Sequence, residues 1–264
     1  MSIEIKTVKI NEMQMRYFSF GNPDNEAVII VPGLSVQSVM EYAEAIVAAY
    51  QKLSSDFCLY VLDRRSDVKE GYTVYDMAED SYQALREIGL KEANLFGVSQ
   101  GGMIAQVMAI RHPEFVKAMA LCSTTSRVGN GEALQKWISY AEDNDAKGLM
   151  EGFADDVYSP AFLAKYRDAI VSMADAVTEE EMKRFVIMAK ATEGFDVYDE
   201  LEKIKCPVIV VGAANDKVLG AQASVDLAEK LNGELFIYEG YGHAVYDEAP
   251  DYLNRIYDFY MRSR

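Results

Sequence analysis

Basic residues are in the minority in this chain of 264 residues. There are 26 Lys and Arg against 42 Asp and Glu, which gives a net charge of -16 at pH 7 with neutral histidine. A field of that sign repels nucleic-acid phosphates and anionic lipid surfaces, so we expect neither nucleic acid nor a membrane as a partner. Acidic runs such as residues 179–181 are expected to solvate the surface.

Long apolar runs and cysteines are also scarce. No stretch reaches the roughly 18 apolar residues of a membrane-spanning helix, and the first ten residues lack the apolar centre of a signal peptide. The three cysteines are an odd number and lie in or beside apolar runs, which favours reduced, buried thiols at Cys58, Cys122 and Cys206. These absences predict a cytoplasmic globular protein.

Six short apolar runs carry the main fold signal. They lack polar alternation, as expected of strands buried on both faces of a parallel sheet, and they span 27–31, 57–62, 93–98, 118–122, 207–211 and 235–238. Most gaps between them show helical apolar spacing, most clearly over 74–88. Two alternating segments, 3–10 and 13–20, predict an antiparallel hairpin. The sequence therefore predicts an α/β fold with a mostly parallel, doubly wound sheet and an N-terminal antiparallel hairpin.

One long stretch departs from this alternation of strand and helix. Residues 125–195 contain no convincing strand and several helix-like segments, so we expect a helical insertion that covers the sheet as a cap or lid. The predicted organisation is an α/β core made of residues 1–124 and 196–264, with a helical cap formed by residues 125–195.

A serine stands between two glycines after one of the buried runs. Gly97-Val98-Ser99-Gln100-Gly101-Gly102 matches G-x-S-x-G and precedes a predicted helix. Ser99 can project from such a sharp turn as a nucleophile, provided that positions 97 and 101 carry no side chain to collide with adjacent backbone. The alternative is a plain glycine turn. A dinucleotide site is disfavoured, because Ser99 stands where that motif needs its second glycine.

A serine hydroxyl needs a general base, and the chain has only two histidines. His112 follows the serine on the same predicted helix, so it should lie about 20 Å away at 1.5 Å per residue. We expect His112 to cap that helix end. His243 lies in the loop Gly240-Tyr241-Gly242-His243-Ala244 after the last predicted strand, and it is the candidate base.

A carboxylate is expected to orient the imidazole. Asp216 follows the run 207–211, and His243 follows the next strand, so both should lie at the sheet edge that carries Ser99. The alternative role of Asp216 is to N-cap the following helix. Other nearby acids either precede the strand or open the last helix, and they fit less well: Asp196, Asp199, Asp247 and Glu248.

A developing oxyanion needs backbone N–H donors. The segment Val31-Pro32-Gly33-Leu34-Ser35 follows the first parallel strand. Its Leu34 N–H is the candidate partner of the Gln100 N–H in an oxyanion hole. A simple Pro-Gly turn is the alternative for this segment.

Taken together, these motifs resemble the α/β-hydrolase family. The matching segments are VPGLS at 31–35, DRRSD at 63–67, YTVYDMAEDSYQALREIGL at 72–90, GVSQGG at 97–102, RHPEFV at 111–116, PVIVVGAANDKV at 207–218 and GYGHAVYDEAP at 240–250. The family usually has His-Gly in place of Pro32-Gly33 and Gly in place of Ser66. The resemblance implies an α/β-hydrolase fold with a cap between the strands that end near residue 122 and begin near residue 207.

The residues and the resemblance jointly imply acyl transfer to water. Ser99 would form an acyl-enzyme from an ester, thioester, lactone or carbon-carbon diketone, and His243 would then activate water, as in a carboxylesterase-like hydrolase. No cofactor is expected, and no metal, because the histidines offer no paired ligand spacing. The alternative is a non-hydrolytic member of the fold, namely a lyase, a perhydrolase or a ligand receptor.

The expected substrate is a small, partly apolar acyl compound bound under the cap. Candidate pocket residues are Ser35, Trp137, Tyr140 and Phe162. The alternative is that such aromatic residues only pack the cap on the sheet. We expect the chain to act as a monomer or a homodimer.

Overall fold

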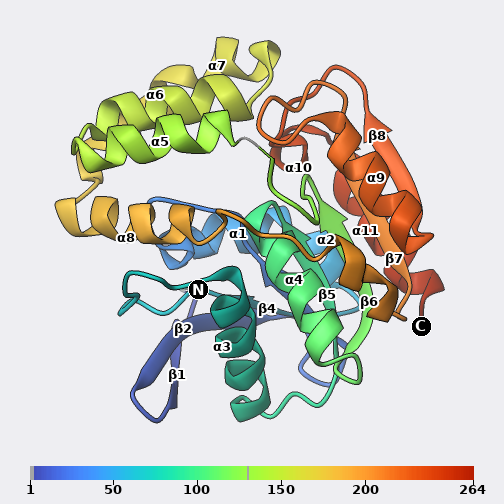
Figure 1. Ribbon diagram of the computed structural model, residues 1–264. Coiled ribbons are helices and arrows are strands. Elements are labelled where there is room, and N and C mark those ends of the chain that lie inside the picture. Colours follow the sequence, from blue (N-terminus) through green and yellow to red (C-terminus); the bar gives the residue numbers. More distant parts are fainter. Residues whose placement is uncertain (1–2, 130) are drawn as a thin grey trace.

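A computed structural model describes residues 3–129 and 131–264. Eight strands form one sheet in the order β1-β2-β4-β3-β5-β6-β7-β8 (Figure 1). Strand β2 pairs antiparallel with β1 and β4, and the other pairings are parallel. The predicted α/β fold with its N-terminal hairpin is therefore confirmed. The strands span Lys6–Ile10 (β1), Met13–Phe20 (β2), Ala27–Val31 (β3), Cys58–Leu62 (β4), Ala93–Val98 (β5), Val116–Cys122 (β6), Val208–Ala213 (β7) and Glu234–Tyr238 (β8).

The central strands are apolar throughout because both of their faces are covered. In β5, Leu95 packs into the core on one face and Phe96 into the core on the other, as successive side chains of a strand must. Strand β8 is an exception. Leu235 is 41% exposed, because β8 lies at the edge of the sheet. The prediction that 235–238 is buried on both faces was wrong for this reason.

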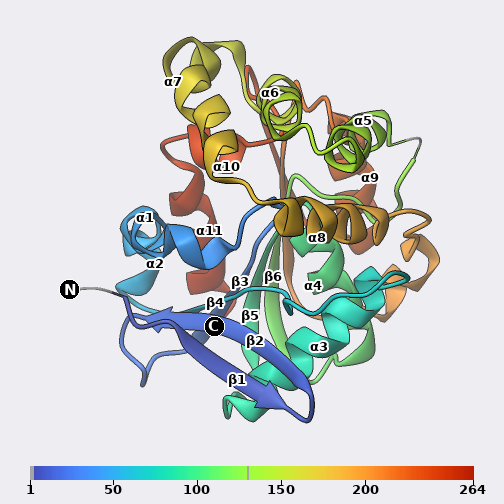
Figure 2. The same ribbon diagram turned by 90° about the vertical axis from the view of Figure 1, so that its left-hand side faces the viewer.

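Helices cover the two faces of the sheet in separate layers (Figure 2). Helices α3, α4 and α9 pack on one face, and α1, α2 and α11 pack on the other. Helix α3 matches the predicted periodic segment, and its start is fixed by a capping box between Thr73 and Asp76. The bounds are Ala43–Ala49 (α1), Gln51–Ser54 (α2), Val74–Glu87 (α3), Gln100–Arg111 (α4), Ala221–Leu231 (α9) and Tyr252–Arg262 (α11), with 3-10 turns at Val39–Tyr42 (η1) and Tyr198–Lys203 (η3).

Four helices, here called the α5–α8 segment, lie between β6 and β7 and cover the carboxyl end of the sheet (Figure 1). Its two ends meet in a short antiparallel bridge between Arg127 and Asp196. Its own apolar core includes Trp137, Leu149 and Phe185. Its helices span Glu132–Glu142 (α5), Ala146–Val157 (α6), Pro160–Ser172 (α7) and Glu179–Lys190 (α8), with a 3-10 turn at Met173–Ala176 (η2).

None of the helices in 3–129 and 131–264 combines the length and the apolar character needed to cross a membrane. The thiols of Cys58, Cys122 and Cys206 are free. Cys58 and Cys122 are buried as predicted, whereas Cys206 is only partly covered.

Candidate active site

Ser99 occupies a strained turn between β5 and α4. Its backbone has φ 52° and ψ -120°, a conformation that residues other than glycine rarely adopt. Four hydrogen bonds hold this backbone. The Ser99 N–H donates to the Cys122 carbonyl (2.8 Å). The Ser99 carbonyl accepts from the N–H groups of Gly102 (2.8 Å) and Met103 (3.3 Å) and from the Thr124 hydroxyl (2.7 Å). The serine is therefore fixed directly at the N-terminal end of α4.

The two glycines of the motif are required by close backbone packing. A Cβ at Gly97 would lie 2.6 Å from the Gly101 carbonyl oxygen. A Cβ at Gly101 would overlap the Val31 carbonyl and lie 2.5 Å from the Pro32 carbonyl oxygen. Both distances are shorter than real side chains tolerate, so the turn and the loop after β3 fit together only without these side chains.

His243 is brought to Ser99 by the loop that follows β8. Its Nε2 lies 3.0 Å from the Ser99 Oγ, and its Nδ1 lies 2.8 Å from the Asp216 Oδ2. The imidazole is 3% exposed. The loop is held against the α5–α8 segment, because the Ala244 N–H donates to the Val157 carbonyl (2.9 Å). The structure therefore connects Ser99, His243 and Asp216 by two consecutive hydrogen bonds, and these three residues are here called the row.

Asp216 is buried in the loop after β7 and is satisfied on both oxygens. Its Oδ1 accepts from the backbone N–H groups of Val218 (2.8 Å) and Leu219 (2.9 Å), and its Oδ2 faces His243. Burial raises the pKa of Asp216, but the contact with His243 and the two backbone donors outweigh it, so the pKa lies below its ordinary value. The alternative role as N-cap of α9 was wrong, because Gly220 occupies that position.

The other titratable residues near the site in sequence have different partners. His112 ends α4 as expected, where its Nε2 lies 3.0 Å from the Glu79 Oε2 and its ring stacks on Tyr82. Asp247 accepts from the Tyr158 hydroxyl (3.3 Å). Glu248 accepts from the backbone and hydroxyl of Ser159. In the described residues, the imidazole of His243 is bonded to Asp216 and to no other carboxylate.

The loop after β3 lies directly against the serine. A Cβ at Gly33 would be 3.4 Å from the Ser99 Cβ, and Leu34 and Gln100 line the same small cavity as Ser99. The two predicted oxyanion donors therefore belong to segments on either side of the nucleophile.

The cavity at Ser99 has a volume of about 50 Å³ and a largely apolar lining. Of the four predicted pocket residues, Trp137 lines it. The other three lie elsewhere: Tyr140 packs by Gly148 and Gly152, Phe162 stacks between Tyr158 and Tyr166, and the Ser35 hydroxyl donates to the Gln37 carbonyl. The complete lining is Leu34, Ser99, Gln100, Met103, Val128, Gly131, Leu134, Trp137, Thr192, Val218 and Leu219.

Several lining residues escaped the sequence analysis, and some had a usable signal. Val218 and Leu219 directly follow Asp216, so their place beside the site follows from that of the aspartate. Leu134 precedes Trp137 by nearly one helical turn and so shares its face of α5. Thr192 carried no comparable signal, since its position depends on how α8 packs.

Comparison with known proteins identifies the family. Residues 26–168, more than half of the chain, match the family model described as alpha/beta hydrolase fold, and the chain belongs to this family. It is 21% identical to 3-oxoadipate enol-lactonase 2 of Acinetobacter baylyi, with 97% of this chain and 96% of that protein covered. It is 25% identical to the putative carbamate hydrolase RutD of Rhizobium rhizogenes, with 96% and 98% covered.

Solved structures agree with the fold. MGS-M2, an alpha/beta hydrolase enzyme from a Medee basin deep-sea metagenome library, superposes with a TM-score of 0.87 at 22% identity, over 97% of both chains. The two curated relatives named above bear names of hydrolytic enzymes and support a hydrolase of this fold.

The packing of the turn yields a stability prediction. Gly101→Ala should lower the free energy of unfolding by about 2 kcal/mol and the Tm by roughly 4–8 °C, because the new Cβ overlaps backbone of the loop after β3. Thermal unfolding followed by circular dichroism measures this. Gly129→Ala is the matched control, since a Cβ there meets nothing within 4 Å. Equal Tm values for the two variants would contradict the packing argument.

Proposed function

We propose that this protein hydrolyses small acyl substrates through a covalent intermediate on Ser99. The observation that carries the proposal is the continuous row from the Ser99 Oγ to His243 (3.0 Å) and from His243 to Asp216 (2.8 Å). A hydroxyl in this arrangement can lose its proton as it attacks a carbonyl carbon, which it cannot do alone at neutral pH.

The proposed reaction has two halves. As the Ser99 Oγ attacks the carbonyl carbon, the His243 Nε2 takes its proton and then gives that proton to the leaving group when the carbon-heteroatom bond breaks. In the second half, His243 takes a proton from the water that attacks the acyl carbon. It then gives that proton to the Ser99 Oγ as the ester bond breaks and the acid leaves, which restores the free hydroxyl. Asp216 keeps the Nδ1 side protonated and stabilises the imidazolium in both halves.

The negative charge that develops on the carbonyl oxygen is proposed to bind in an oxyanion hole. The N–H groups of Leu34 and Gln100 are proposed as its donors, and the positive end of α4 begins at Gln100. Donors fixed in advance stabilise the transition state more than the substrate, which is what raises kcat.

The size of the cavity supports short acyl groups as substrates. The cavity of about 50 Å³ is far smaller than the roughly 300–1,000 Å³ of pockets that hold drug-sized ligands, so it favours a short acyl group. Its apolar lining suits an alkyl acyl group. The α5–α8 segment is the proposed cap, since Leu134 and Trp137 of α5 close this cavity.

Covalent labelling tests the nucleophile. A fluorophosphonate probe should modify the wild-type protein at Ser99, because the probe traps a hydroxyl that a neighbouring base activates. Peptide mass spectrometry locates the adduct. Labelling should be absent in Ser99→Ala and strongly slowed in His243→Ala. An adduct that persists in Ser99→Ala would overturn the assignment.

The role of the acid gives a second prediction. Asp216→Asn should lower kcat by about 10²- to 10⁴-fold, because the amide favours the wrong imidazole tautomer while it can still accept from Val218 and Leu219. Steady-state hydrolysis of p-nitrophenyl acetate measures kcat. Asp247→Asn is the matched control, since that carboxylate lies four residues after His243 in the sequence but bonds to Tyr158. Similar losses in both variants would contradict an orienting role specific to Asp216.

The cavity predicts substrate selectivity. Across p-nitrophenyl esters from acetate to octanoate, kcat/KM should be highest for acyl groups of about two to four carbons and fall as the chain lengthens. Trp137→Ala should move the optimum to longer acyl groups. Phe162→Ala, an aromatic residue of the same segment outside the cavity, should leave the profile unchanged. A preference for octanoate in the wild type would contradict the reading of the cavity.

A further inference from the structure

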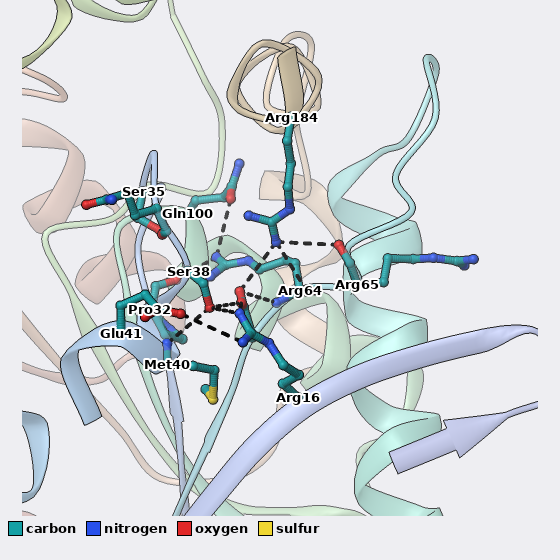
Figure 3. A network of polar contacts seen from close by, with 12 residues as sticks. Arg16, Pro32, Ser35, Ser38, Met40, Glu41, Arg64, Arg65, Gln100 and Arg184 are labelled. Atoms are coloured by element: carbon teal, nitrogen blue, oxygen red, sulfur yellow. Dashed lines mark hydrogen bonds and ion pairs between the residues drawn. The ribbon is translucent and has the colours of Figure 1, made fainter. Parts of the chain in front are cut away.

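A buried arginine lies behind the candidate oxyanion hole. Arg64 is the second residue after β4 and is 8% exposed. Burial lowers the pKa of Arg64 to about 10, so the guanidinium remains protonated at neutral pH. Figure 3 shows this side chain at the centre of a polar network between the sheet, the loop after β3 and helix α8.

The guanidinium contacts both chain segments that supply the proposed donors. Its Nη2 donates to the Pro32 carbonyl at 2.5 Å and lies 3.3 Å from the Gln100 Oε1 (Figure 3). Pro32 precedes Leu34 by two residues, and Gln100 is itself a proposed donor. The amide of Gln100 is held on its other side too, because its Nε2 donates to the Met188 carbonyl of α8 at 2.7 Å.

We propose that Arg64 is a positioning residue for the oxyanion hole, an inference that rests on the proposed function of Ser99. A peptide's C=O and N–H point in opposite directions, so fixing the Pro32 carbonyl prevents the 32–33 peptide from turning over. That constrains the adjoining peptide, which carries the Leu34 N–H. The same nitrogen also holds the Gln100 side chain. One guanidinium group therefore constrains both segments that carry the proposed donors, the N–H groups of Leu34 and Gln100.

Stability alone is a poor explanation for this arginine. The acid beside it, Asp63, accepts from the Ser38 hydroxyl (2.5 Å), from Arg184 (3.4 Å) and from the backbone N–H of Arg64 (2.8 Å), but it has no hydrogen bond to the Arg64 guanidinium among the described residues. The side-chain bonds of Arg64 go to neutral oxygens, and its Nε has no partner among the described residues. Burying a cation against neutral acceptors costs more than it returns. Its neighbour Arg65 shows the contrast, because it pairs at the surface with Asp67 (2.8 Å).

Helix α8 holds the backbone that carries Arg64. The Arg184 Nη2 donates to the carbonyls of Arg64 (3.2 Å) and Arg65 (3.4 Å), as Figure 3 shows. The same helix accepts from Gln100 through the Met188 carbonyl. The position of α8 therefore affects the proposed oxyanion hole through two contacts, one with the backbone of Arg64 and one with the side chain of Gln100.

Kinetics of substituted proteins test the proposal. Arg64→Met should lower kcat for p-nitrophenyl acetate by about 10- to 100-fold, the range expected when donors are misplaced, with KM within about threefold of wild type. Arg64→Lys should retain more of kcat, because its ammonium can still donate to the Pro32 carbonyl. Arg65→Met is the matched control in the same loop and should keep the wild-type kcat. Should Arg64→Met not fold, Arg64→Gln takes its place under the same criteria.

A double substitution separates positioning from folding. If Arg64 acts partly through the Gln100 side chain, Arg64→Met combined with Gln100→Met should lose less than the product of the two single losses. The proposal is overturned if Arg64→Met keeps kcat within about twofold of wild type, if the loss falls in KM, or if Arg65→Met loses as much. The wild type tests the proposed role of Ser99 independently. If it shows neither fluorophosphonate labelling nor turnover, both proposals are overturned. If it is labelled and active but the Arg64 variants keep the wild-type kcat, only the proposal for Arg64 is overturned.

Discussion

The strained turn at Ser99 is the constraint on which the rest of the site depends. A positive φ at a serine is unfavourable and persists only where surrounding contacts determine it, here the bonds to Cys122, Gly102 and Thr124. The turn ends a fully buried strand and starts a fully buried stretch of helix, so it cannot relax without disturbing the core. Glycine at 97 lets the turn close on its own backbone, and glycine at 101 lets the loop after β3 approach, which brings Gly33 against the serine.

Topology supplies the other two members of the row. Strands β7 and β8 are parallel neighbours, so the loops that follow them leave from the same edge of the sheet. The loops are bonded to each other, since the Asn215 N–H donates to the Tyr241 carbonyl at 3.1 Å. Asp216 directly follows Asn215, and His243 lies two residues after Tyr241. The short contact between carboxylate and imidazole therefore follows from backbone pairing and not from the side chains alone.

These two features explain what could be predicted from the sequence. The strands were recognisable because burial on both faces demands unbroken apolar runs, and Ser99, Asp216 and His243 were found because each follows such a run. The edge position of β8 was not recognisable, since Leu235 to Tyr238 are as apolar as a central strand. Tyr140 and Phe162 were selected by residue type, yet which helical face points to the cavity depends on how α5 to α8 pack together. Arg64 lies in the matching segment 63–67, but nothing local pointed to its role, because its partners lie 32 and 36 residues away along the chain.

The α5–α8 segment makes hydrogen bonds to the sequence neighbours of both His243 and Ser99. Through the Val157 carbonyl it holds Ala244, next to His243, and through the Met188 carbonyl it holds the side chain of Gln100, next to Ser99. Gly242 packs so closely on Val157 that a Cβ would lie 2.8 Å from its carbonyl oxygen. A displacement of the whole segment as one body would therefore break hydrogen bonds to both loops and disturb the alignment of Ser99 with His243. Leu134 and Trp137, which line the cavity, belong to α5, and neither of these two hydrogen bonds is made by that helix.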